Sequence, residues 1–220
     1  MKRTRLKQRI GNLFILGAML LAMPLEVFAN TPAFPFTDVP QNHWARSYVE
    51  FVHVNHIMNG ITNTNFAPNT NLSRAMAVTM LFRTHHGRIA NANDARTNPF
   101  TDVSTEHWAA PYITWAHAND IVDGIGNNRF APNDYLSREQ FAVMLHRFAA
   151  GEDIDTGVPT TFNLNRFTDR LQISSWAVDA MRWANYKEIL SGTSQTTIAP
   201  HAVATRAQGA ALLYRFSNNV

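Results

Sequence analysis

The sequence predicts an all-α protein built from three copies of one helix–loop–helix unit. The motif Phe-Thr-Asp opens each copy, at residues 36–38, 100–102 and 167–169. Each copy then has a tryptophan, a glycine 16 residues later, a proline 8 residues after the glycine and an arginine 6 residues after the proline. These spacings are identical in the three copies. One supersecondary unit has therefore been copied, and such units pack on one another.

We expect the copies to span residues 36–86, 100–150 and 167–217 and to fold as one cooperative domain. One pair of short helices buries too little apolar surface to be stable alone. The recurring polar, aromatic and glycine residues are the candidate ligand-binding residues, because a repeated function depends on what the copies share. They are Asp38, Asp102, Asp169, Trp44, Trp108, Trp176, Gly60, Gly124, Gly192, Arg74, Arg138 and Arg206.

The second copy shows the predicted elements most clearly. A first helix is predicted over residues 106–119, because apolar residues recur there at helical spacing. Gly124 is expected to end this element in the left-handed conformation. Residues 125–134 follow as a loop rich in Gly, Asn and Pro. The predicted buried stripe of the first helix is Trp108, Tyr112, Ile113, Trp115 and Ala116.

A second helix is predicted from Arg138 to about residue 149. Ser137 is its expected N-cap, and Ser73 and Thr205 hold the same place in the other copies. The arginine at the first helical position lies where free amides and the helix dipole favour an anion. A guanidinium there adds a bidentate donor for carboxylate. The predicted buried face is Phe141, Ala142, Met144, Leu145 and Phe148.

Each recurring residue type also has a structural interpretation. The arginines could pair with the aspartates of a neighbouring copy, the tryptophans could pack in the core or stack on a sugar, and the glycines could serve backbone geometry or close approach of a ligand. A second arginine follows nine residues after the first in every copy. It lies on the opposite face of the helix, so we predict a structural role for Arg83, Arg147 and Arg215.

The first 29 residues are predicted to be a secretory signal peptide. Five basic residues precede an apolar run over 13–23, and small residues stand at positions 27 and 29. The apolar run is too short to span a bilayer, so we expect an exported chain without stable membrane insertion. Without the signal the chain has 14 basic and 15 acidic residues, which does not support nucleic-acid binding.

Polar segments over 87–99 and 151–166 are predicted surface linkers, the second partly extended and mobile. No cysteine is present, and neither the pair His53 and His56 nor the pair His85 and His86 recurs in the other copies, so we predict no metal site and no cofactor. No nucleophile–base spacing or phosphate loop recurs. An enzymatic function is therefore not expected.

The copies resemble S-layer homology domains over residues 36–217. The resemblance rests on the opening Phe-x-Asp, on Trp-Ala at 44–45, 108–109 and 176–177, on a loop motif at 66–68, 130–132 and 198–200, and on a Thr-Arg-Ala-Glu-like motif at 73–76, 137–140 and 205–208. The chain departs from that last motif, because Met76, Gln140 and Gln208 replace its glutamate. Repeat 3 also carries one extra residue before Trp176, Ile198 in place of phenylalanine, and His201.

The resemblance implies a pseudo-threefold spindle in which the second helices form a central bundle. It also implies an exported monomer that binds a secondary cell-wall polysaccharide in grooves between the copies, through pyruvate ketals on an amino sugar. The alternative is a scaffold that binds S-layer subunits or peptides at the cell envelope. Because repeat 3 has drifted most, we expect Arg206 to contribute less to binding than Arg74 and Arg138. Whether the chain acts alone, as an adaptor or as a piece of a longer protein stays open.

Overall fold

The computed structural model describes residues 34–86 and 98–220, and within them it is helical. The predicted signal peptide and residues 87–97 of the first linker lie outside this range. The described residues form isolated backbone bridges but no β-strand, so the predicted all-α class is confirmed. The elements are α2 (Arg46–Val54), α3 (Arg74–His86), α4 (Ala110–Ala118), α5 (Arg138–Gly151), η2 (Arg170–Gln172), η3 (Ser175–Ala177), α6 (Val178–Tyr186) and α7 (Arg206–Asn219).

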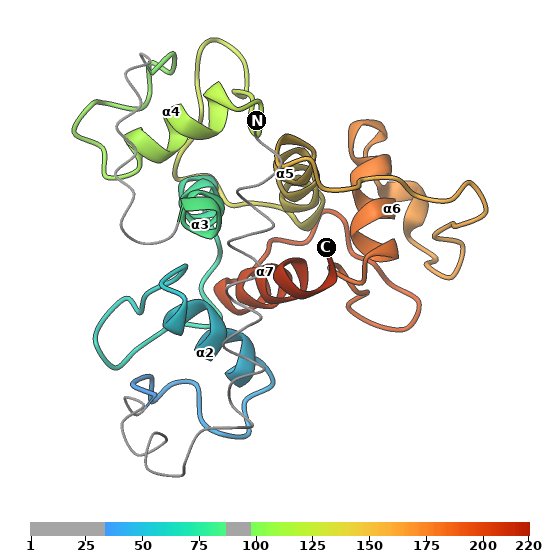
Figure 1. The fold of residues 1–220 in the computed structure, drawn as a ribbon, viewed down its shortest axis with the longest axis horizontal. Coiled ribbons are helices and arrows are strands. Elements are labelled where there is room, and N and C mark those ends of the chain that lie inside the picture. The colour runs from blue at the N-terminus through green and yellow to red at the C-terminus, as the bar shows by residue number, and fades with distance from the viewer. Residues whose placement is uncertain (1–33, 87–97) are drawn as a thin grey trace.

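The three second helices, α3, α5 and α7, lie around the centre of the molecule, and the first helices α2, α4 and α6 lie outside them (Figure 1). Helix α3 packs on α4, α5 packs on α6, and α7 packs on α2. The second helix of each repeat therefore contacts the first helix of the next, and repeat 3 closes onto repeat 1. This ring of contacts fits the predicted spindle, whose threefold symmetry stays a prediction.

Backbone hydrogen bonds close the same ring where the loops enter the second helices. The amide of Leu72 donates to the carbonyl of Ala204 (2.8 Å), that of Ala204 to Leu136 (2.9 Å), and that of Leu136 to Leu72 (2.9 Å). Each of the three residues belongs to a different repeat. No repeat can therefore be removed without breaking two of these bonds.

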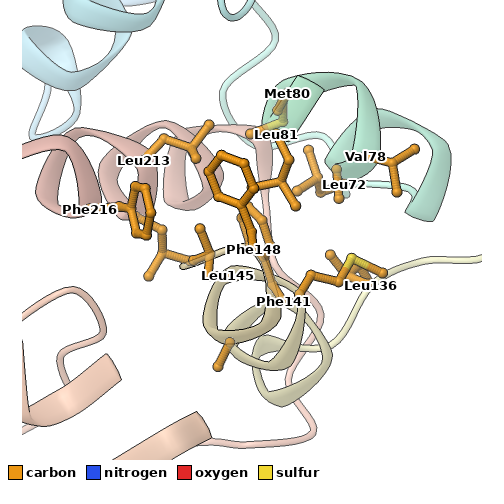
Figure 2. Close-up of a cluster of buried hydrophobic side chains, with 14 of the residues drawn as sticks. Leu72, Val78, Met80, Leu81, Leu136, Phe141, Leu145, Phe148, Leu213 and Phe216 are labelled. Carbon is orange, nitrogen blue, oxygen red and sulfur yellow. The ribbon is translucent and has the colours of Figure 1, made fainter. Parts of the chain in front are cut away.

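One hydrophobic core is shared by the three second helices (Figure 2). The predicted inner face of α5 is confirmed, because all five of its apolar residues are buried. Gly209 permits close approach of α7: a Cβ there would lie 3.1 Å from Met80 Cε and 3.2 Å from Leu72 Cδ2. The labelled side chains of the cluster are Leu72, Val78, Met80, Leu81, Leu136, Phe141, Leu145, Phe148, Leu213 and Phe216.

The glutamines that replace the family glutamate act in helix capping. Ser137 accepts from the Gln140 amide, and the Gln140 side chain accepts from the Ser137 amide. Thr205 and Gln208 form the same capping box on α7. An amide oxygen can accept this bond as a carboxylate does, so the substitution keeps the helix start and removes a charge.

The first helices are shorter than predicted. Helix α4 begins at Ala110, not at residue 106, so Trp108 lies before the helix and 54 % of it is exposed. The left-handed residue after α4 is Asp120 (φ 57°), not Gly124. His56 and Glu188 take the left-handed conformation at the corresponding places after α2 and α6.

The segment that follows α5 is not a free linker. The indole Nε1 of Trp183 donates to the carbonyl of Asp155 (3.3 Å), and the Arg182 guanidinium donates to the carbonyl of Phe162 (2.9 Å). Ile154, Val158 and Phe162 also pack against the core. The segment is therefore tied to α6 and the core near both of its ends, and the mobility expected of its central stretch stays a prediction.

Candidate functional site

Each recurring arginine reaches into the loop of another repeat. Arg74 of repeat 1 contacts the loop of repeat 2, and its Nε donates to the carbonyl of Phe130 (2.8 Å). Arg138 of repeat 2 contacts repeat 3 through the carbonyl of Ile198 (3.1 Å). We name these places junction 1/2 and junction 2/3. Junction 3/1 is the third, where Arg206 donates to the carbonyl of Phe66 (2.9 Å).

A second donor of each guanidinium holds the residue that precedes the recurring glycine. The Nη2 atoms of Arg74, Arg138 and Arg206 donate to the carbonyls of Asp123 (3.1 Å), Ser191 (2.6 Å) and Asn59 (2.7 Å). All three arginines are more than nine-tenths buried. Burial lowers the pKa of each below its ordinary value, partly offset by nearby aspartates.

One edge of each buried guanidinium stays available. In the described part of the chain the Nη1 groups of Arg74, Arg138 and Arg206 have no hydrogen-bond partner, and none of them is a fully buried unpaired atom. An arginine has five N–H donors. These arginines therefore hold the junctions together and still present donors at the surface.

The recurring aspartates fix the same loops from within their own repeat. Asp38 accepts from the amides of Phe66 (2.8 Å) and Ala67 (2.7 Å), so Asp38 and Arg206 hold the same loop residue by its N–H and its C=O. Asp102 and Asp169 do likewise in their repeats. The proposed direct pairing of these arginines with the aspartates is therefore not what the hydrogen bonds show.

These backbone bonds also set the titration of the aspartates. Desolvation raises the pKa of Asp102 and Asp169, but the two loop amides and a nearby arginine outweigh it, so both pKa values lie below the ordinary 3.8. The nearby arginine is Arg129 for Asp102 and Arg138 for Asp169. Both carboxylates are charged at neutral pH.

The helix start itself is not a free anion site. In α3 the amides of Arg74 and Ala75 donate to the carbonyls of Asp134 and Pro132 of the next repeat, both at 3.0 Å. Helices α5 and α7 use their first two amides in the same way. Loop carbonyls thus occupy the place where the sequence suggested an anion, and the anion-binding capacity rests on the arginine side chains.

The recurring glycines are required by packing within their own repeat. A Cβ on Gly124 would lie 2.6 Å from the Arg129 carbonyl oxygen and 2.9 Å from the Phe100 ring. Gly60 and Gly192 are crowded in the same way by Phe36 and Phe167. None of the three has a positive φ. Their absence of a side chain, not their backbone freedom, explains them, and their predicted role in ligand contact stays a prediction.

The later arginines meet the earlier ones at the junctions. Arg147 Nη1 donates to the Asp123 carboxylate (2.7 Å), the residue whose carbonyl Arg74 holds. Arg215 Nη1 donates to the Ser191 hydroxyl (3.2 Å), the residue whose carbonyl Arg138 holds. In junction 3/1, Arg83 Nη1 donates to the carbonyl of Ile57 (3.4 Å), two residues before Asn59.

Sequence reasoning missed this convergence because it compared the two arginines of one helix. Those two do point apart, but each junction takes its first arginine from one repeat and its second from the next. The nine-residue spacing, identical in all three copies, was the signal that could have found it.

The recurring tryptophans lie at the surface. Trp44, Trp108 and Trp176 are 57 %, 54 % and 57 % exposed, so the interpretation as core residues was wrong. The rings of His43 and His107 stack on the first two. Large exposed aromatic rings at matching places suit stacking on a flat ligand face.

The drifted residues of repeat 3 lie around Arg138, not around Arg206. Ile198 supplies the carbonyl that Arg138 holds, whereas Arg74 and Arg206 each lie over a phenylalanine ring at 4.6 Å. Ser174, in the stretch of repeat 3 that carries the extra residue, lies at the buried carboxylate of Glu139, where its amide (3.0 Å) and hydroxyl (2.8 Å) both donate. The reason given for a weaker Arg206 therefore does not hold.

In the described ranges, no group of three or more His, Cys, Asp or Glu side chains could hold a metal ion. No helix in those ranges has the length and apolar character to cross a membrane.

Comparison with known proteins decides the family. The model of the S-layer homology domain matches residues 35–77, 99–142 and 166–210, three tandem positions that together cover more than half of the chain. The chain belongs to the S-layer homology domain family. Each match contains one first helix and the start of one second helix, and this family is a cell-surface anchoring module, not a catalytic one.

Curated relatives support the same assignment. The chain is 27 % identical to an S-layer protein of Bacillus thuringiensis subsp. finitimus over 199 residues, covering 89 % of this chain and 23 % of the relative. It is 24 % identical to a cellulosome-anchoring protein of Acetivibrio thermocellus, over 81 % of this chain and 36 % of the relative. An endoglucanase of Bacillus sp. (strain KSM-635) is 30 % identical over 97 % of this chain, which spans 22 % of that enzyme. These matches concern the S-layer homology part of much longer proteins.

Proposed function

We propose that the chain anchors at the cell wall by binding a secondary cell-wall polysaccharide that carries pyruvate ketals on an amino sugar. The observation that supports this most is the meeting of two arginines, from two different repeats, at each of the three junctions. A pyruvate ketal presents a carboxylate on a sugar ring, and guanidinium donors suit a carboxylate in both charge and geometry.

The buried arginine and the later arginine have different tasks in this proposal. Arg138 is held by two loop carbonyls, so its position is fixed before a ligand arrives. Its Nη1 edge and the half-buried Arg215 supply the donors for the carboxylate. Because the first donor is preorganised, little conformational entropy is lost when the ligand binds.

Aromatic side chains next to junction 2/3 suit the sugar ring. Arg215 lies over the ring of Tyr48 (5.4 Å), and Tyr48 in turn contacts Trp44 edge-to-face (6.3 Å). These contacts form a chain from the arginine pair to an exposed indole of repeat 1. A ligand-binding role of Trp44 is part of the proposal on this ground, and those of the other recurring tryptophans and of the glycines stay predictions.

Three junctions on one domain would act together on a repetitive polymer. When one junction is occupied, the next sugar unit is presented to the other junctions at a high effective concentration. Modest affinity at each junction is then enough for lasting attachment at the cell surface.

Sedimentation with purified cell-wall sacculi tests the proposal. We expect the chain without residues 1–29 to sediment with intact sacculi and to stay in the supernatant once the non-peptidoglycan polymer has been stripped. Binding that survives stripping would contradict the glycan proposal and favour the alternative of a scaffold for envelope proteins, or peptidoglycan itself.

A further inference from the structure

In each junction an exposed residue directly precedes the recurring glycine, and this residue is different in the three junctions. Junction 3/1 has Asn59 there, junction 1/2 has Asp123, and junction 2/3 has Ser191. The buried arginine holds the backbone carbonyl of this residue in all three cases. The side chain therefore decides what lies next to the free donors.

Junction 1/2 already contains a carboxylate. Asp123 Oδ2 lies 2.7 Å from Nη1 of Arg147, and the side chain of Asp123 is 72 % exposed. Asp123 therefore occupies the place at Arg147 that a ligand carboxylate would have to take. The acids Asp102 and Asp134 also act on Arg74. Among the described residues Arg129 pairs with one of them, at 3.6 Å from Asp102.

Junction 2/3 has no exposed carboxylate at the corresponding place. Arg215 donates there to the neutral hydroxyl of Ser191. Arg138 and Arg215 both donate to Ser191, and Arg215 adds to burial in lowering the pKa of Arg138. Asp169 of this junction accepts from two loop amides, as Asp102 does in junction 1/2. The buried Glu139 accepts from Ser174 and lies 3.4 Å from His201.

We propose that the residue before the recurring glycine sets the ligand preference of each junction, so that junction 2/3 binds the carboxylated sugar and Asp123 disfavours it at junction 1/2. Asp123 acts as an internal competitor, because it neutralises Arg147 and repels a second carboxylate. This inference rests on the proposed function and reverses the expectation that the drifted repeat binds worst.

A reciprocal exchange tests the inference. The probes are an N-acetyl amino sugar bearing a 4,6-pyruvyl ketal and the same sugar without it, and the measurement is isothermal titration of the chain without residues 1–29. We expect Ser191→Asp to weaken binding of the ketal by about fivefold, the range that close exposed charges allow. Asp123→Ser should strengthen binding at junction 1/2 by a similar factor, so that the titration shows a second ketal site beside that of junction 2/3. The sugar without the ketal should show neither change.

Matched controls keep the result interpretable. Asp179→Ser removes an acid that is 89 % exposed and pairs with Arg182 in α6, so it should leave the affinity unchanged. Asp123 and Ser191 are exposed, and unchanged melting temperatures would show that both variants fold. If Ser191→Asp and Asp123→Ser bind the ketal just as Asp179→Ser does, the inference is overturned while the proposed function stands. A wild-type chain that binds neither probe, nor sacculi, would contradict the proposed function itself and this inference with it.

Discussion

The two ends of each second helix use arginine in opposite ways. At the N-terminal end Arg74, Arg138 and Arg206 are buried. Each of them donates two hydrogen bonds to loop carbonyls of another repeat. Further along the helix, Arg147 and Arg215 are partly exposed and contact side chains at the rim of a junction. The comparison shows that a residue recurring in every copy can serve assembly first.

The largest expected effect is on stability, at the buried end. Arg206→Ala leaves the carbonyls of Phe66 and Asn59 without their donor and opens a gap between repeats 3 and 1. We expect a loss of about 3 kcal/mol in the free energy of unfolding, measured by urea denaturation. Arg215→Ala is the control, with a loss below about 1 kcal/mol. Equal losses in the two variants would contradict the distinction between the ends.

The glycine beside the buried arginine gives the next largest effect. Gly60→Ala would place a Cβ 2.3 Å from the Thr62 carbonyl oxygen and 2.5 Å from the Phe36 ring. We expect a loss of about 2 kcal/mol from overpacking. Gly151→Ala, which has open space around the added atom, is the matched control. A Gly60→Ala variant as stable as Gly151→Ala would show that the loop yields easily.

At acid pH the protein should lose stability, because the recurring aspartates that hold the loops at the buried arginines become protonated. The pKa values of Asp102 and Asp169 are lowered in the fold, so their contribution to stability is complete above about pH 4 and is lost as the pH falls through their folded values. Melting temperature against pH should therefore decline below pH 4. In Asp102→Asn the decline of the melting temperature with falling pH should be shallower. A variant with the same decline as the wild type would contradict this explanation.

The sequence predicted the parts of the fold that depend on local pattern. The repeat, the all-α class, the cap at Ser137 and the inner face of α5 followed from spacing and periodicity. The partner of each arginine did not, because Arg206 and Phe66 are 140 residues apart in the chain. The tryptophans were ambiguous because their exposure depends on where each first helix begins, and that boundary lies two residues after Trp108.

At the exposed end, the expected effect is on binding and not on folding. Arg215→Ala should lower affinity for wall polymer by about fivefold with little change in melting temperature, since its pair is open to water. The same openness predicts that wild-type affinity falls with rising salt, because exposed charge pairs are screened. It should also fall at acid pH, as the ligand carboxylate is protonated. An affinity that changes with neither salt concentration nor pH would rule out a carboxylate ligand.

Binding to one wall polymer with and without its ketals tests the central claim most directly. Mild acid removes pyruvate ketals, and the treated and untreated polymer can then be compared for affinity to the wild-type chain. If arginine pairs hold the carboxylate, removal of the ketals should lower affinity by about tenfold or more, as loss of charge-assisted hydrogen bonds implies. Equal affinity for the two preparations would contradict the claim.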